Sequence, residues 1–267
     1  MAAKKLFLTD LDGTLLDDNK KITPATMAAL EKFVAAGNVF AISTGRGTEN
    51  AVYVQKNYGL TFPGSYVIAY NGAEIYDYSA GKSIYRVGVP LDVAREILQM
   101  AAERGVHVHT FNDRYIVGSA YDEEMTFYKR IIKTPVIITD DVMSELDKPP
   151  CKLIGIELHD HEKLEAFRLA VLDKFGDVIT AIYSNANYLE LFSKEAGKGS
   201  ALLRLCEYLN IPRENSMAAG DAENDISMIQ AAGLGIAMLN ADDEVKKAAD
   251  VVTEADNNHD GLVAFLG

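Results

Sequence analysis

The first part of the chain alternates between short apolar runs and amphipathic stretches. Residues 5–10 form an apolar run that ends in polar residues, which predicts a short buried strand. Residues 23–37 predict a helix, because apolar residues recur at helical spacing between a capping threonine and a glycine. Residues 39–43 predict a second strand and residues 47–58 a second helix. Strand, helix and strand in this order predict two parallel strands with a right-handed crossover.

The middle of the chain has a different pattern. Two apolar segments flank Asn71 and Gly72, a pair that strongly favours a β-hairpin. Beyond residue 82 we expect two successive units that each combine a helix with neighbouring strands. The helices are predicted at residues 91–104 and 162–175, and the strands at residues 106–111, 115–119, 153–158, 178–183 and 188–192. This order predicts a separate antiparallel sheet with its helices on one face.

The alternating pattern returns after residue 198. It predicts helices at residues 198–209 and 224–232, strands at residues 216–219 and 234–238, and a short helix near residue 244. The predicted fold class is therefore α/β, with a Rossmann-like core whose doubly wound sheet is mostly parallel. This core is discontinuous, at residues 1–82 and 193–267, and an inserted α+β domain occupies residues 83–192. We expect a cleft between the two domains.

The charge of the chain restricts its partners. The 267 residues carry a formal net charge of −13, which would repel nucleic acid and anionic membranes. The chain has no signal-peptide pattern and no apolar stretch that could span a bilayer, so we expect a cytoplasmic protein. Cys151 and Cys206 lack metal-binding spacing and are expected to be buried free thiols. If the substrate is anionic, a local positive charge must reverse the sign of the field, and a divalent cation is the obvious candidate.

Two acidic clusters follow predicted strands. Residues 10–14 contain Asp10 and Asp12, and residues 220–225 contain three further acidic side chains. Ligands in open α/β sheets bind at the carboxyl ends of the strands. Each cluster alone also fits a structural role, as a solvated turn or as a helix cap. Together they place several carboxylates at one sheet edge, which favours a Mg²⁺ site because this ion prefers oxygen ligands.

A phosphate group would also need hydrogen-bond donors. Thr44 ends the second strand and offers a hydroxyl and a backbone N–H, and Lys198 offers a positive charge where the core pattern resumes. Taken singly, Thr44 also fits a helix cap and Lys198 a surface lysine. Lys194 competes with Lys198 for the phosphate role, and the glycine after Lys198 favours Lys198.

These segments resemble the four motifs of the haloacid dehalogenase-like (HAD-like) hydrolases in order and spacing. The matching segments are Asp10-x-Asp12-Gly13-Thr14-Leu15, Ser43-Thr44-Gly45-Arg46, Lys198-Gly199 and Gly220-Asp221-x-x-Asn224-Asp225. Asn71-Gly72, Asn240-Ala241 and Asp260-Gly261 resemble the Cof-type, or sugar-phosphatase, branch. The resemblance covers essentially the whole chain. That branch carries an α/β cap of the C2 type between the second and third motifs, where the insert is predicted.

The resemblance implies a two-step phosphoryl transfer. Asp10 would attack phosphorus and form an aspartyl-phosphate, and Asp12 would act first as general acid and then as general base. Mg²⁺ would be held by Asp10, the backbone carbonyl of Asp12 and Asp221. The remaining roles concern the outer shell and the phosphate. Asp225 would act in the outer shell, Thr44 and Lys198 would bind phosphate oxygens, Asn224 would either orient Asp221 or contact the phosphate, and Arg46 and Asn71 are further candidates for substrate binding.

The resemblance predicts a Mg²⁺-dependent phosphomonoesterase that acts on a small phosphorylated metabolite, with a sugar phosphate as the substrate class. A phosphomutase and a non-catalytic module that binds Mg²⁺ and phosphate are the alternatives. No nucleic acid, membrane or obligate protein partner is expected. Cap hairpin residues would select the substrate, and the candidates are Asn112, Asp113, Arg114, Asn185 and Asn187.

Four histidines alternate in two pairs in the insert. They are His107 with His109 and His159 with His161. Neither pair has further ligands at zinc-binding spacing, so metal binding by these pairs is not expected.

Overall fold

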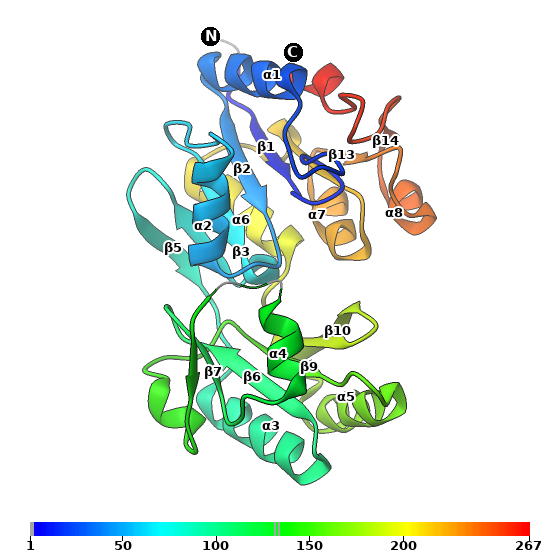
Figure 1. Cartoon of the computed structure of the whole chain (residues 1–267). Coiled ribbons are helices and arrows are strands. Elements are labelled where there is room, and N and C mark those ends of the chain that lie inside the picture. Colours follow the sequence, from blue (N-terminus) through cyan, green and yellow to red (C-terminus); the bar gives the residue numbers. More distant parts are fainter. Residues whose placement is uncertain (1–2, 131, 133) are drawn as a thin grey trace. The chain divides into compact units, whose positions relative to one another are not determined.

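The computed structural model describes residues 3–130, 132 and 134–267 (Figure 1). The chain divides into two compact units. One unit comprises Met1–Tyr85 and Gly197–Gly267, and the other comprises Arg86–Ala196. The first unit is therefore assembled from two segments that are far apart in the sequence.

An eight-stranded sheet forms the centre of the first unit, in the order β14-β13-β12-β1-β2-β3-β4-β5. All neighbouring strands from β14 to β3 are parallel, and β4 runs antiparallel to β3. The strands are β1 (Leu6–Thr9), β2 (Val39–Ser43), β3 (Tyr66–Ala69), β4 (Glu74–Asp77), β5 (Lys82–Arg86), β12 (Ser216–Gly220), β13 (Leu234–Ala237) and β14 (Val251–Val252). The predicted α/β class with a mostly parallel sheet is confirmed.

Helices cover both faces of this sheet (Figure 1). They are α1 (Pro24–Ala35), α2 (Thr48–Asn57), α6 (Lys198–Leu209), α7 (Ile226–Ala231) and α8 (Asp243–Ala248), with short 3-10 helices at Tyr70–Gly72 (η1), Arg213–Asn215 (η3), Glu223–Asp225 (η4) and Val263–Phe265 (η5). Alternate residues of β1 face opposite layers. Leu8 packs in a cluster with Leu202 of α6, whereas Phe7 packs edge-on against Phe33 of α1.

The register of the central strands determines where the residues that follow these strands lie. Thr9 of β1 pairs with Ala219 of β12 and with Ile42 of β2. The three strands therefore end at one level, and the residues that follow them share one edge of the sheet.

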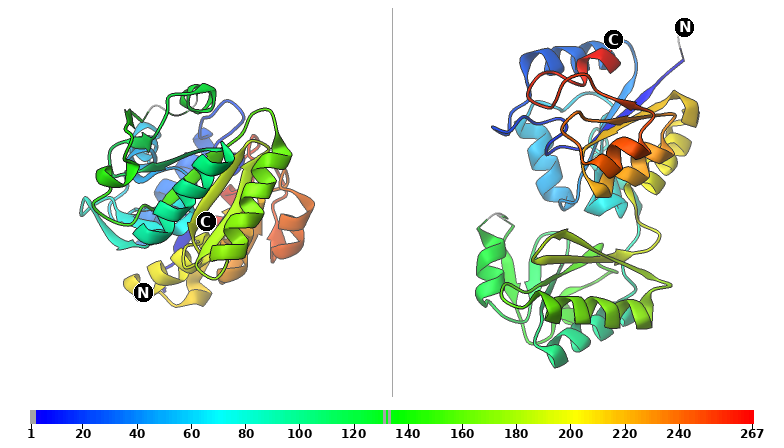
Figure 2. Two further views of the ribbon diagram at one scale, coloured as in Figure 1. Left: turned by 90° about the horizontal axis from the view of Figure 1, so that it is seen from below. Right: turned by 90° about the vertical axis from the view of Figure 1, so that its right-hand side faces the viewer.

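The second unit is built on a six-stranded sheet in the order β10-β11-β9-β6-β7-β8. Its pairs are antiparallel except for β7 and β8, which are parallel. Its elements are α3 (Leu91–Arg104), β6 (His107–Phe111), β7 (Ile116–Gly118), α4 (Glu123–Lys129), β8 (Val136–Ile138), η2 (Val142–Glu145), β9 (Lys152–Ile156), α5 (His161–Phe175), β10 (Ile179–Asn185) and β11 (Tyr188–Ser193). Helices α3 and α5 lie along one face (Figure 2), where Ile97 and Phe167 join the core.

The prediction that all helices of the insert share one face is wrong, because α4 lies on the opposite face. Tyr128 of α4 packs against His109 and Tyr188, which point away from the face that α3 and α5 cover. Helix α4 spans only seven residues, so its apolar spacing was too short to stand out. Strands β5, β8 and β14 were also not predicted.

Two simpler expectations can be compared directly with the structure. Cys151 and Cys206 are buried free thiols, as predicted. Among the helices of the described residues, none has the length and apolar character that crossing a membrane would require.

Candidate active site

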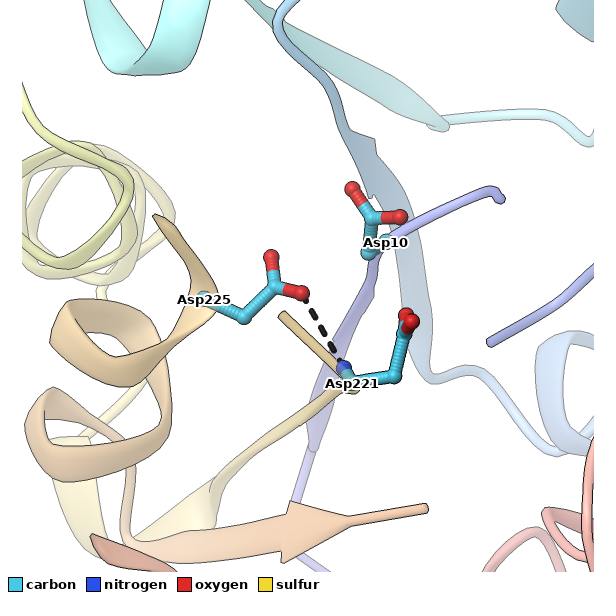
Figure 3. A group of neighbouring side chains, drawn as sticks. All are labelled: Asp10, Asp221 and Asp225. Atoms are coloured by element: carbon cyan, nitrogen blue, oxygen red, sulfur yellow. Dashed lines mark hydrogen bonds between the residues drawn. The ribbon is translucent and has the colours of Figure 1, made fainter. Parts of the chain in front are cut away.

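Three carboxylates gather at the carboxyl edge of the first sheet (Figure 3). Asp10 follows β1, Asp221 follows β12, and Asp225 ends the short helix η4. One oxygen from each of these side chains lies within 4.8 Å of the others. Within the described part of the chain, no other group of acidic, histidine or cysteine side chains is arranged in this way.

Lys198 stands among these carboxylates. Its Nζ atom lies 2.6 Å from Oδ1 of Asp10 and 2.6 Å from Oδ1 of Asp225, and it also approaches the carbonyl of Ser43 at 3.5 Å. Lys198 begins α6, and its side chain is completely buried. Asp10 and Asp225 raise the pKa of Lys198 above its usual value although burial opposes this, so the lysine stays charged.

One lysine does not balance three carboxylates. Burial raises the pKa of Asp10 to about 7 against the charge of Lys198, and the charge of Asp225 adds to the shift. Burial also raises the pKa of Asp221 to about 6, opposed by a hydrogen bond from Thr14. The all-oxygen donor set and the excess negative charge fit a hard divalent cation such as Mg²⁺.

Both carboxylate oxygens of Asp225 are bonded to other groups of the protein. One of its oxygens pairs with Lys198, and the other accepts hydrogen bonds from the backbone N–H groups of Asp221 and Ala222, each at 3.1 Å. These bonds shape the loop that presents Asp221. Asn224 lies in the same loop, within η4, and is half-buried.

Gly13 and Thr14 bring the first loop against Asp221. Gly13 has a φ of +83°, and a Cβ atom at this position would overlap the Asp221 carboxylate. The hydroxyl of Thr14 donates to Oδ1 of Asp221 at 2.5 Å. Sequence reasoning assigned neither residue a role in holding Asp221. The only sequence signal was their place in the first motif, because their partner lies 207 residues away.

Asp12 pairs with two positively charged side chains. Its carboxylate accepts hydrogen bonds from Lys20 at 2.8 Å and from Arg46 at 2.9 Å. Although burial opposes ionisation, these two partners hold the pKa of Asp12 below its usual value. The sequence left open whether Arg46 meets substrate or an acidic neighbour, and the structure pairs it with Asp12. Lys20 was not predicted, since a lysine in a polar turn resembles an ordinary surface residue.

Thr44 lies at the same sheet edge, directly after β2. It is buried, and its hydroxyl accepts a hydrogen bond from the backbone N–H of Arg46 at 3.2 Å. Asn71 is close by, because its backbone N–H donates to the carbonyl of Thr44 at 3.1 Å.

Other candidates have different partners. Lys194 donates to the carbonyl of Gly176 within the second unit. His107 bridges Asp122 and His109, with ring-nitrogen distances of 2.7 Å and 3.0 Å. His159 contacts Glu123, and His161 contacts the carbonyl of Ala186.

A sequence profile described as haloacid dehalogenase-like hydrolase matches residues 7–266. The chain belongs to this family. Among similar proteins is the 5-amino-6-(5-phospho-D-ribitylamino)uracil phosphatase YitU of Bacillus subtilis. It is 29% identical over 270 residues, which cover 98% of this chain and 96% of YitU. The phosphatase YwpJ of Bacillus subtilis is 29% identical over 281 residues, covering 96% of each chain.

Solved structures share this fold. The crystal structure of a haloacid dehalogenase-like hydrolase from Bacteroides thetaiotaomicron superposes with a TM-score of 0.88 at 28% identity, covering 98% of each chain. A Thermotoga maritima protein gives a TM-score of 0.87 at 31% identity, covering 98% of this chain and 96% of the other. The family and the activity of its relatives make this chain a phosphatase of the hydrolase class.

Proposed function

We propose that this phosphatase is a Mg²⁺-dependent phosphomonoesterase that works through an aspartyl-phosphate on Asp10. The main support is one arrangement of side chains. The Asp10 carboxylate lies at the end of β1, is paired with the buried Lys198, and shares a space with the oxygens of Asp221 and Asp225. This arrangement combines a nucleophile, a positive charge and a set of metal-ligating oxygens in one place.

The carboxylates of Asp10 and Asp221, with the backbone carbonyl of Asp12, would hold the metal in this proposal. When bound, Mg²⁺ would neutralise part of the negative charge that the carboxylates and the phosphate bring together. Asp225 would act in the outer shell of the metal site and hold Asp221 in place, through its hydrogen bonds from the backbone N–H groups of residues 221 and 222. Asn224 would either help to orient Asp221 or contact the phosphate.

The chemistry would proceed in two balanced steps. An oxygen of Asp10 would form a bond to phosphorus while the bond from phosphorus to the substrate oxygen breaks, and Asp12 would give its proton to the departing alkoxide. Water would then attack phosphorus, lose its proton to Asp12 and release free phosphate from Asp10. Lys198 and Thr44 would bind the phosphate oxygens whose charge changes in both steps.

The position of Asp12 favours its role as a base. Lys20 and Arg46 stabilise the ionised carboxylate, which is the form that accepts a proton from water. They oppose the protonated form that the first step requires. In this proposal Asp12 therefore leaves at least one of these partners when it protonates the leaving group.

The proposed substrate is a small phosphorylated metabolite, with a sugar or polyol phosphate as the class. YitU supports this class, because its named substrate carries a phosphorylated ribityl chain. Residues 83–192 would serve as the cap that selects the substrate, and Arg46 and Asn71 would assist. The buried free thiols fit the predicted cytoplasmic location.

Phosphate release from sugar phosphates, polyol phosphates, nucleotides and an aryl phosphate tests the proposal, with Mg²⁺ or with EDTA. Wild type should release phosphate only with Mg²⁺, and Asp10→Asn should be inactive. Asp243→Asn is a matched control, because Asp243 is an exposed aspartate of the same unit and should keep full activity. Metal-independent turnover, or an active Asp10→Asn variant, would contradict the mechanism.

A further inference from the structure

A turn next to the candidate site has an unusual backbone. Tyr70, Asn71 and Gly72 follow β3 and have φ angles of 50°, 55° and 99°. The Asn-Gly pair is typical of left-handed hairpin turns, which accounts for the last two residues. It does not account for Tyr70, because a bulky side chain disfavours a positive φ. Tyr70 and Asn71 are both buried, so neighbouring structure holds the turn in place.

The turn is bonded to the segment that carries Thr44. The backbone N–H of Tyr70 donates to the carbonyl of Arg46 at 2.9 Å, and that of Asn71 donates to the carbonyl of Thr44 at 3.1 Å. The backbone angles of Tyr70 orient the following peptide unit, which carries the N–H group of Asn71, toward Thr44. The bond from Asn71 to Thr44 therefore depends on the left-handed conformation of Tyr70.

Two glycines allow the turn to approach the segment that follows Thr44. A Cβ atom on Gly45 would lie 3.1 Å from Oδ1 of Asn71, and one on Gly47 would lie 2.7 Å from Oη of Tyr70. The side chains of the turn therefore pack directly on the backbone of residues 45–47, on both sides of Arg46.

The same turn also contacts the start of α6. A Cβ atom on Gly72 would overlap the backbone carbonyl of Gly197, which is the residue that caps α6. Lys198 follows immediately. One three-residue turn thus touches the two backbone segments that carry Thr44 and Lys198.

We infer that the turn Tyr70–Gly72 positions Thr44 and Lys198 relative to each other, with Tyr70 and Asn71 acting as positioning residues for the phosphate. The inference rests on the proposed function, which assigns phosphate binding to Thr44 and Lys198. The strained backbone is retained because it is the conformation that makes both contacts together. Displacement of a catalytic group by about 1 Å can cost on the order of 100-fold in rate.

The first test compares Gly72→Ala with Gly64→Ala. Both glycines have a positive φ and lie at opposite ends of β3, but a Cβ atom on Gly64 would meet nothing within 4 Å. Gly72→Ala should lower kcat by about 100-fold and raise the inhibition constant of inorganic phosphate at least several-fold. Gly64→Ala should change both values by less than about twofold, although its melting temperature also falls because alanine disfavours a positive φ. Normal kcat and phosphate inhibition in a folded Gly72→Ala variant would overturn the inference.

The second test decides the matter if Gly72→Ala does not fold. Tyr70→Gly and Tyr70→Ala both remove the ring, but only glycine adopts a positive φ without cost. If the backbone conformation positions the site, Tyr70→Gly should retain about 5- to 30-fold more kcat than Tyr70→Ala, from the cost of the left-handed conformation. Equal activities would show that only ring packing matters and would overturn the inference.

Failure of the inference differs from failure of the proposed function. An active, Mg²⁺-dependent wild type with unaffected turn variants would overturn the inference alone. A wild type without turnover would reject the proposed function. In that case calorimetry of inorganic phosphate binding tests the inference separately. The inference expects weaker phosphate binding by Gly72→Ala than by wild type and unchanged binding by Gly64→Ala. Equal phosphate binding by wild type and both variants would overturn it.

Discussion

The Nζ atom of Lys198 lies 2.6 Å from Oδ1 of Asp225, and both side chains are completely buried. Lys198→Met should therefore leave Asp225 and Asp10 close together without a counter-charge. Removal of one partner of a buried ion pair costs about 3–5 kcal/mol of unfolding free energy. Denaturant unfolding with metal absent measures this loss, and phosphate release should disappear. Lys194→Met is the matched control, because the side chain of Lys194 is exposed and donates to the carbonyl of Gly176. This variant should change the free energy of unfolding by less than about 0.5 kcal/mol.

Asp10→Asn should stabilise the metal-free protein at pH 8 while it abolishes turnover. The folded-state pKa of Asp10 is raised from 3.8 to about 7, so the folded protein holds this proton more tightly than the unfolded chain. Stability from the protonated group is present at low pH and is lost as the pH rises toward about 7. Melting temperatures in EDTA from pH 5 to pH 8 should therefore fall more steeply for wild type than for Asp10→Asn. Parallel curves would refute the raised pKa.

Gly13→Ala should weaken metal activation more than it weakens the fold. A Cβ atom at Gly13 would displace the Asp221 carboxylate, whereas one at Gly37 would meet nothing within 4 Å. Both glycines have positive φ angles, +83° and +91°, so both alanine variants carry similar backbone strain. The Mg²⁺ concentration for half-maximal activity should rise at least about tenfold in Gly13→Ala, within the range seen when partners of metal ligands are removed, and should stay unchanged in Gly37→Ala. A similar Mg²⁺ requirement in both would contradict this role of Gly13.

His109→Phe should make the fold less sensitive to mild acid. Burial holds the pKa of His109 well below 6.5, and the neighbouring His107 and Lys152 add to this. The unfolded chain takes up this proton near pH 6.5 but the folded chain does not, so stability present above pH 6.5 is lost as the pH falls. Phenylalanine suits the site because His109 packs among the rings of Phe111 and Tyr128. The melting temperature of the variant should decline less between pH 7 and pH 5 than that of wild type, and an equal decline would exclude His109 as the cause.

The sequence predicted elements with strong periodicity and recognisable ends. The bounds of β2 and α3 match the prediction, and the two acidic clusters lie at one sheet edge because parallel strands end together. Helix α4 was missed because seven residues give too few repeats. Side-chain contacts between and within loops were also missed. The Thr14 to Asp221 bond and the Lys20 to Asp12 pair depend on how loops fold against each other, which local pattern does not encode.

The neighbours of β1 determine when the first unit can complete its sheet. Strand β1 lies between β2 and β12, so one of its two edges stays unpaired until β12, which begins at Ser216, has been synthesised. The second unit, Arg86–Ala196, is continuous and has all its strands before that point. During synthesis from the amino end, the inserted unit is therefore available to fold first, while β1 still exposes an unpaired apolar edge. Closure of the parallel sheet then requires contacts between distant segments, which favours slow folding.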